Sequence, residues 1–302
     1  MRVYPGLEII DTPFEGTRQI NVALFTGGRH ALVDTGVAGC PTATILPALE
    51  ELGVGAVDLH LVINLHAHAD HIGGNGEVFT ASGELTTFAA HAADAPAIED
   101  HHTLATSVYG LRDPQRIRAL LARCGAHVPV QRVLQDGDEI DLKGLTLRVI
   151  HAPGHTAGNI ALYEPAGRAL VQGESVMGAP VAGPDGLRST PFGANPPAYR
   201  RTLEALRALD FWVFISSHRP LTDRAGGLAE IEASLAGLEE WEAACRRALA
   251  QGAAGPAALA ATAAAEGGYA PSPRHDRQVA AWLEGELGAG RATRGEDGTL
   301  RG

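Results

Sequence analysis

Four side chains able to bind metal ions fall within six residues of this chain. His66, His68, Asp70 and His71 follow the apolar run 59–64, which is typical of a buried strand. In an extended segment, the side chains of residues two apart point the same way, so His66 and His68 can bind one cation. Asp70 and His71 can face a second cation as the chain enters a helix. Packed beside an apolar strand, these groups would repel one another or lose hydration unless a metal cation compensated them.

Three further candidate ligands lie much later in the sequence. His155 stands in a Pro-Gly-His-Thr loop after the predicted strand 145–150, Glu174 follows the strand 169–172, and His218 follows the strand 211–216. Each comes just past a strand's carboxyl end, the edge at which open α/β sheets assemble sites. We therefore expect these side chains to converge on the first cluster, with His155 as the third ligand of the first metal.

Asp34 also ends a predicted strand, 31–33, and is followed by a small-residue turn. Its carboxylate either orients a neighbouring site or caps the helix that follows. Taken alone, the residue is better explained as a cap.

The elements that must position these residues alternate between strands and helices. Strands are predicted at 7–10, 21–26 and 31–33, and helices at 42–52 and from residue 75 to 80. The stretch 89–125 is mostly helical in composition, contains Tyr109, and is interpreted as an insertion covering the site. Its histidines are expected to be exposed: His91, His101 and His102.

The composition changes to Ala, Glu and Leu after Pro220. Helices are predicted at 228–250, 253–266 and 274–287, and the tail around Arg294 and Gly298 can form a small wing. No cluster of ligand-type residues occurs there. We predict an α/β domain at 1–222 and a helical, wing-like appendage at 223–302 with a packing or homodimerisation role.

The overall composition limits the kinds of partner that this protein is expected to bind. The chain has 302 residues, 45% of them apolar, and a formal net charge of -11. This charge argues against a nucleic-acid partner or an anionic membrane surface, because both require a basic face. A small-molecule substrate is expected.

The cysteines and the N-terminus indicate a cytoplasmic protein. Cys40, Cys124 and Cys245 are widely spaced and form no CxxC pair, which favours ordinary thiols in a reducing compartment. The first residues lack the apolar core of a signal peptide, and no apolar run reaches 18 residues.

Taken together, the motifs resemble those of the metallo-β-lactamase superfamily. The pattern runs from Asp34-Thr35-Gly36 through His66-x-His68-x-Asp70-His71 and Pro153-Gly154-His155-Thr156 to an acidic strand end and His218. It covers about residues 5 to 220 in the order and spacing of the family. The C-terminal part is similar, more loosely, to the appendage of the branch containing glyoxalase II and beta-lactamase-like protein 2.

The resemblance implies an αββα sandwich with a dinuclear site at the sheet edges. It assigns His66, His68 and His155 to the first metal and Asp70, His71 and His218 to the second. Asp34 would orient the ligands by hydrogen bonding. Zn²⁺ is the default for mixed imidazole and carboxylate sites, with two ions expected, although iron and manganese fit the same ligands.

Glu174 departs from the family pattern. Most members carry aspartate there, where it bridges both metals, and the extra methylene of glutamate adds about 1.5 Å of reach. The change bears on the spacing and identity of the metals, and through them on the class of substrate.

Two adjacent cations would lower the pKa of a shared water toward 7, giving hydroxide at neutral pH, and polarise the bond under attack. Asp70 would accept the proton and deliver it to the leaving group. We predict hydrolysis of an ester, thioester, lactone or amide in a small molecule. Arg219 and Tyr199 are the candidates for contact with an anionic group of the substrate, although a surface salt bridge explains Arg219 equally well.

Two other functions fit the same residues. One is a mononuclear-iron thiol dioxygenase, and the other is a ligand sensor that has kept the fold without catalysis. Two zinc ions per chain would exclude the first, and hydrolytic turnover would exclude the second.

Overall fold

The computed structural model describes residues 1–16, 18–190, 193–295 and 299–302. The chain divides into two compact units. The first consists of Met1–Ala152, Gly158–Glu174 and Asp210–Arg224, and the second consists of Pro153–Ala157, Ser175–Leu209 and Ala225–Gly302. The domain boundary expected at residues 222 and 223 remains a prediction, since a compact unit need not fold by itself.

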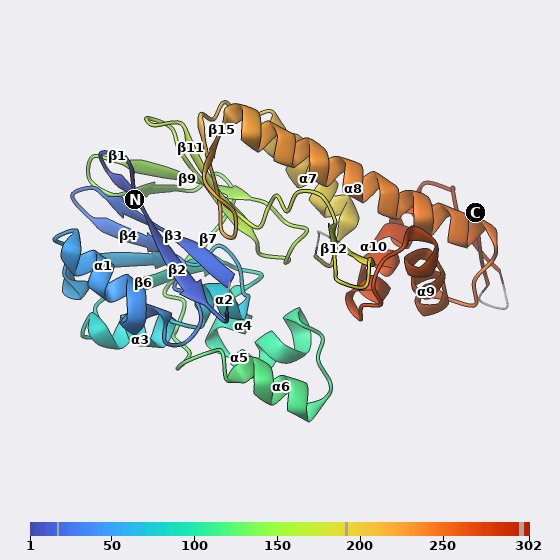
Figure 1. Cartoon of the computed structure of the whole chain (residues 1–302), viewed down its shortest axis with the longest axis horizontal. Helices are drawn as coiled ribbons and strands as arrows, with labels where there is room; N and C mark the ends of the chain where they lie inside the picture. The colour runs from blue at the N-terminus through green and yellow to red at the C-terminus, as the bar shows by residue number, and fades with distance from the viewer. Residues whose placement is uncertain (17, 191–192, 296–298) are drawn as a thin grey trace. The chain divides into compact units, whose positions relative to one another are not determined.

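The first unit contains two sheets (Figure 1). The seven-stranded sheet follows chain order, and its bounds are β1 (Arg2–Tyr4), β2 (Leu7–Phe14), β3 (Arg18–Thr26), β4 (His30–Val33), β5 (Leu59–Ile63), β6 (Thr87–His91) and β7 (Arg132–Leu134). Strands β1 to β4 are antiparallel, whereas β4 to β7 run parallel. The carboxyl ends of β4 and β5 therefore lie next to each other.

The second sheet has six strands in the order β15-β14-β11-β10-β9-β8. Their bounds are β8 (Glu139–Asp141), β9 (Thr146–His151), β10 (Ile160–Glu164), β11 (Ala169–Gly173), β14 (Val213–Ser216) and β15 (Thr222–Asp223). Only β11 and β14 form a parallel pair among the described strands of this sheet. Their carboxyl ends, which carry Glu174 and His218, are thus neighbours.

Alternating side chains of the strands build two cores. In β3, Ala23 and Phe25 join the core between the two sheets, whereas Val22 and Leu24 join a core on the other face of the seven-stranded sheet. Successive residues of a strand point to opposite faces, so a strand buried on both sides is apolar throughout. This accounts for the continuous apolar run of β3.

Helices of the first unit cover that other face and pack against Ala67, Ala69 and Ile72 of the histidine-rich segment. Their bounds are α1 (Leu46–Glu51), α2 (Ala69–Ile72), α3 (Asn75–Ala81), α4 (Ala95–Glu99), α5 (His101–Thr103) and α6 (Pro114–Leu121), with short helical turns at Pro41–Ile45, Ala56–Asp58 and Leu104–Val108. Leu49 of α1 and Val78 of α3 belong to the core against β3. The predicted insertion 89–125 begins inside β6 and contains α4 to α6.

The exposure expected for the insertion histidines is only partly right. His102 is exposed, but His101 is 8% exposed and its ring packs edge-on against His127. The reason is local: Asp100 accepts hydrogen bonds from the backbone N–H groups of His102 and Thr103, and this cap directs His101 inward. His91 and Tyr109 are half-buried.

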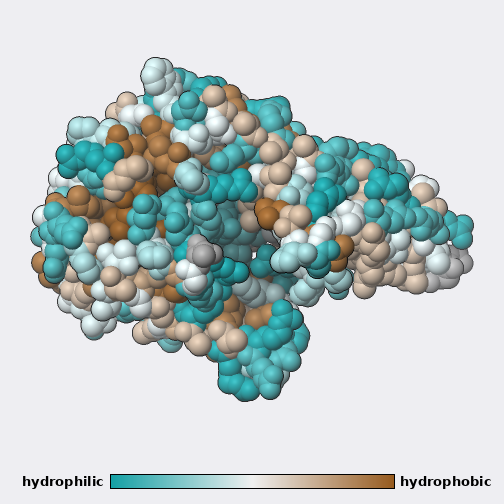
Figure 2. All heavy atoms as spheres, in the orientation of Figure 1, coloured by the Kyte–Doolittle hydropathy of each residue, from teal (hydrophilic) through white to brown (hydrophobic). Residues whose placement is uncertain are grey.

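The second unit is mainly helical. Its elements are β12 (Val181–Ala182), β13 (Arg188–Ser189), α7 (Pro196–Arg207), α8 (Arg224–Ala250), α9 (Pro256–Gly267), α10 (Arg274–Gly288), β16 (Thr293–Arg294) and β17 (Leu300–Arg301). β16 and β17 pair antiparallel at the expected wing, of which Gly298 lies outside the described residues. The side of α8 in view is mostly hydrophilic (Figure 2). The buried residues of this helix include Trp241. None of the helices described is long and apolar enough to cross a membrane.

Candidate metal centre

The candidate ligands of the first unit come from the carboxyl ends of three strands. β5 leads into His66 and His68, and α2 then carries Asp70 and His71. His68 is still extended, with φ -116° and ψ 151°, and marks the point where the strand exit becomes a helix. The predicted change from extended to helical backbone within this motif is therefore present.

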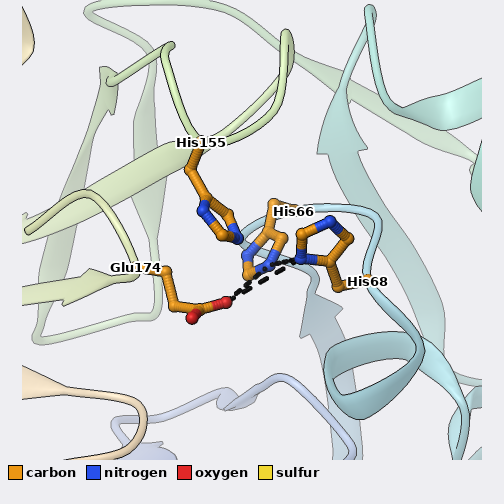
Figure 3. Close-up of side chains that lie close together, drawn as sticks. All are labelled: His66, His68, His155 and Glu174. Carbon is orange, nitrogen blue, oxygen red and sulfur yellow. Dashed lines mark hydrogen bonds and ion pairs between the residues drawn. The ribbon is translucent and has the colours of Figure 1, made fainter. Parts of the chain in front are cut away.

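Glu174, at the end of β11, faces the first pair of imidazoles (Figure 3). Its Oε2 atom lies 3.2 Å from His66 Nε2 and 3.9 Å from His68 Nδ1. These two nitrogens are themselves 3.1 Å apart. Two ring nitrogens and a carboxylate oxygen thus converge on one small volume, as first-row metal ions require.

A second group is formed by Asp70, His71 and His218, whose ligand atoms all lie within 4.8 Å of one another. His218 Nε2 is 3.5 Å from Asp70 Oδ2 and 3.9 Å from Glu174 Oε1. His71 Nε2 is 3.5 Å from Glu174 Oε2. Glu174 therefore contacts both groups, and its two oxygens are directed to different histidines.

His155 lies in the loop Pro153–Ala157, between β9 and β10, and is 5% exposed. Figure 3 draws it with His66, His68 and Glu174 as the first group of candidate ligands. Its loop belongs to the second unit.

Asp34 is hydrogen-bonded to a candidate ligand and does not cap the helical turn that follows it. Its Oδ2 accepts a hydrogen bond from His71 Nδ1 at 2.7 Å, and its Oδ1 accepts one from the Leu65 N–H at 2.9 Å. The next helical turn starts at Pro41 and has no side-chain cap. With Nδ1 held by Asp34, Nε2 of His71 is the ring nitrogen directed at Glu174.

His218 is held in the same manner from the other side. Its Nδ1 is 2.7 Å from the Gln19 carbonyl oxygen, an acceptor that places the ring proton there. The Asn21 side chain donates hydrogen bonds to the carbonyl groups of Ser216 and Arg219, which flank His218. Residues of strand β3 thereby position a candidate ligand that lies 199 residues after Gln19 in the chain.

Two supporting residues have no signal in the sequence. The buried Asp94 carboxylate accepts hydrogen bonds from the Ala67 N–H at 2.8 Å and the Gly158 N–H at 2.7 Å. Tyr109 packs its ring 4.8 Å from that of His68, and its hydroxyl accepts a hydrogen bond from the Ala69 N–H. An aspartate before Ala-Pro suggests a cap, so only the fold shows that Asp94 holds the peptide between His66 and His68.

The charged groups of the candidate metal centre shift one another's pKa values. Burial by itself lowers the pKa of His71, but the Asp34 carboxylate and, after it, Glu174 outweigh burial and raise this pKa well above its usual value. Burial raises the pKa of Asp70, but the neighbouring imidazoles, led by His71, outweigh burial and lower it. Asp70 is therefore an ionised carboxylate at neutral pH.

The residues present fit a metal ion. His71 Nε2 is fully buried and makes no hydrogen bond within the described chain. A buried polar atom of this kind is costly unless a further group satisfies it. Together with the mixed imidazole and carboxylate donors, this matches sites for zinc and related transition metals.

A cleft of about 470 Å³ opens beside these ligands and is lined by Phe14, Arg18, Gln19, Asp70, Glu174 and His218. Arg18 supplies the positive charge of the cleft, a residue that sequence analysis missed. Arg219, expected to contact substrate, is half-buried and is not among the lining residues described. The expectation for Tyr199 is wrong: it is fully buried, and its hydroxyl accepts the Met177 N–H.

Residues 16–218 match the family described as Metallo-beta-lactamase superfamily. This match covers more than half of the chain. The protein belongs to this superfamily.

Among curated relatives of this superfamily member, the "Hydroxyacylglutathione hydrolase" of Methylococcus capsulatus is 29% identical over 204 residues, which are 67% of this chain and 62% of the relative. The matches to two further relatives of the same name cover 38% and 44% of the length of those proteins. The chain thus spans less than two thirds of these curated relatives.

Solved structures support the fold. A metallo-beta-lactamase family protein from Thermus thermophilus has a TM-score of 0.72 at 21% identity, covering 99% of both chains. The class B3 di-zinc metallo-beta-lactamase LRA-12 from an Alaskan soil metagenome has a TM-score of 0.53 at 20% identity, covering 79% of this chain and 88% of that one. The predicted fold class, a metallo-β-lactamase α/β sandwich, is confirmed.

Proposed function

We propose that this superfamily member is a metal-dependent hydrolase with a dinuclear centre. In this proposal His66, His68 and His155 hold one ion, Asp70, His71 and His218 hold the other, and Glu174 contacts both. The observation that carries the proposal is the placement of Glu174, with Oε2 3.2 Å from His66 Nε2 and Oε1 3.9 Å from His218 Nε2. A mononuclear site would not need one carboxylate divided between two sets of ligands.

Zinc is the metal proposed, because sites of mixed imidazole and carboxylate donors favour it. When bound, such ions acidify water and polarise the oxygen of the bond under attack. The side chains and backbone of the protein position the ligands and transfer a proton. Asp34 and the Gln19 carbonyl fix the ring protons of His71 and His218, and Asp70, an ionised carboxylate facing the cleft, accepts the proton that the attacking water loses.

The substrate proposed is a small thioester or ester that carries an anionic group. Its curated relatives are named for hydrolysis of a glutathione thioester, which supports a thioester. Arg18 is the cationic residue among those described as lining the cleft, and it would pair with the anion. Glutathione itself is not implied, since the basic and aromatic residues that bind it in glyoxalase II are not recognisable in this sequence.

Metal analysis and a substrate panel test this proposal. The purified full chain should contain close to two zinc ions, and it should hydrolyse thioesters or esters in a panel that also holds lactones, sulfate esters and β-lactams. Chelation should remove the activity, and zinc should restore it. A single iron with oxygen consumption, or tight binding of panel compounds without turnover, would replace the proposal with a dioxygenase or a sensor.

Variants of Glu174 test the dinuclear centre directly. Glu174→Gln keeps the shape but removes the charge, and we expect its zinc content to fall from about two to about one per chain. Glu174→Asp retracts the carboxylate by about 1.5 Å and should weaken binding less. The exposed Glu50→Gln is the control. Full zinc content in Glu174→Gln would contradict a shared carboxylate.

A further inference from the structure

The second unit contains a cavity of its own, of about 490 Å³, and none of the candidate metal ligands lines it. One wall is the alanine-rich face of α9, including Ala257, Ala260 and Ala261. The other side consists of the segment after α9 and the start of α10, which lies against α9 (Figure 1). The volume is in the range of pockets that hold small molecules.

A buried imidazole lines this cavity. His275, the second residue of α10, is 3% exposed, and the structure records no hydrogen bond to either of its ring nitrogens within the described chain. Its ring packs 4.7 Å from that of Trp241, which fixes its position. The ring therefore presents a hydrogen-bonding group at the wall of the cavity.

A second polar group lies in the same wall. Tyr269 is 2% exposed, and its hydroxyl has no hydrogen-bond partner among the described residues. Its ring packs 5.1 Å from Trp241. Trp241 thus supports both His275 and Tyr269, so the polar side of the cavity is rigid while the alanine side is smooth and apolar.

We propose that this cavity binds a small neutral molecule that has an apolar body against the alanines of α9 and one hydrogen-bonding group that meets His275. Asp276 is the charged residue among those lining the cavity, so an anion would be repelled. A cation would lose its hydration against alanine side chains. Burial lowers the pKa of His275, so a neutral ring, able to donate and to accept, faces the ligand.

Calorimetric titration of the full chain with 1-octanol, 4-ethylphenol and octanoate tests the ligand class. The alcohol and the phenol should bind, and octanoate should bind at least tenfold more weakly. Binding of none of the three, or preferred binding of octanoate, would overturn the proposal.

Two matched variants of α9 locate the binding. Ala261 and Ala258 are both exposed alanines on this helix, but only Ala261 lines the cavity. Ala261→Phe should fill the space and abolish binding, whereas Ala258→Phe should bind like the parent chain. Equal binding by both variants would place the ligand elsewhere and refute the assignment.

A third variant tests the polar contact. His275→Phe keeps the ring against Trp241 and removes the nitrogens. It should weaken 1-octanol binding by about fivefold, the effect expected for one hydrogen bond. Circular dichroism shows whether the variant is folded, and undiminished octanol binding by folded His275→Phe would contradict the contact.

Discussion

Oδ2 of Asp34 accepts a hydrogen bond from Nδ1 of His71 across 2.7 Å, and both side chains are almost completely buried. Asp34 adopts a positive φ of 64°, so its backbone turns sharply at the end of β4. Aspartate and asparagine tolerate this conformation better than other residues with a side chain. The sharp turn brings the carboxylate to the ring of a ligand on the neighbouring strand exit.

Asp34→Asn should weaken zinc binding by about 10- to 100-fold, the usual effect of losing the carboxylate behind a metal-binding histidine. Asparagine suits the same backbone, so the change isolates the charge. Competition with a chromophoric chelator measures the affinity. Asp11→Asn, at an exposed position of β2, is the control and should bind as the parent does. An unchanged affinity for Asp34→Asn would deny Asp34 this orienting role.

Asp94→Ala should lower the free energy of unfolding by about 3 kcal/mol, because the N–H groups of Ala67 and Gly158 lose a charged acceptor. The exposed cap mutation Asp100→Ala should cost only about 1 kcal/mol. Urea unfolding of both variants gives the comparison. A loss no larger for Asp94→Ala than for Asp100→Ala would show that the two amides find other partners.

The stacked rings of His91 and His151, with centroids 4.0 Å apart, should make the first unit sensitive to acid. Burial lowers the pKa of His91 below 6.5, and His151 lowers it further. The unfolded chain then takes up the proton more readily than the folded one. The contribution of neutral His91 to the free energy of unfolding is therefore fully present above pH 6.5. It is lost as the pH falls from 6.5 through the lowered pKa of the folded state.

His151→Phe should retain the stacking and reduce this loss. We expect the fall in Tm between pH 7.5 and pH 5.5 to be smaller than in the parent chain, as measured by differential scanning calorimetry. His102→Phe, at an exposed histidine, should leave the fall unchanged. If the Tm of both variants fell as far as that of the parent chain between pH 7.5 and pH 5.5, the pair of His91 and His151 would not cause the acid sensitivity.

Arg18→Gln should raise KM for thioesters with an anionic acyl group by up to about fivefold, the range for exposed charge pairs, with little change in kcat. Neutral thioesters should be unaffected. Arg29→Gln, an exposed position outside the cleft, is the control. Steady-state kinetics with matched charged and neutral substrates measures the difference, and an equal change for both substrates would count against charge recognition.

Much of this protein follows from local sequence. The spacing of His66, His68, Asp70 and His71 after an apolar strand predicted both the ligand types and the change from strand to helix, because each depends on neighbouring residues alone. The predicted helices 228–250 and 274–287 correspond to α8 and α10 for the same reason. Tyr199 was misjudged because a tyrosine on an amphipathic helix can face either way.

Only the tertiary structure decided which distant groups meet. Parallel pairing of β11 with β14 places Glu174 beside His218, and pairing of β4 with β5 brings Asp34 to His71. The residues around Asp94 and Arg18 in the sequence give no sign that either one belongs to the site. Asp94 acts through the backbone amides that the fold brings to it, and Arg18 through the cleft that it lines. Local spacing determines the donors that a segment can offer, whereas strand order and the packing of the sheets determine which donors share one site.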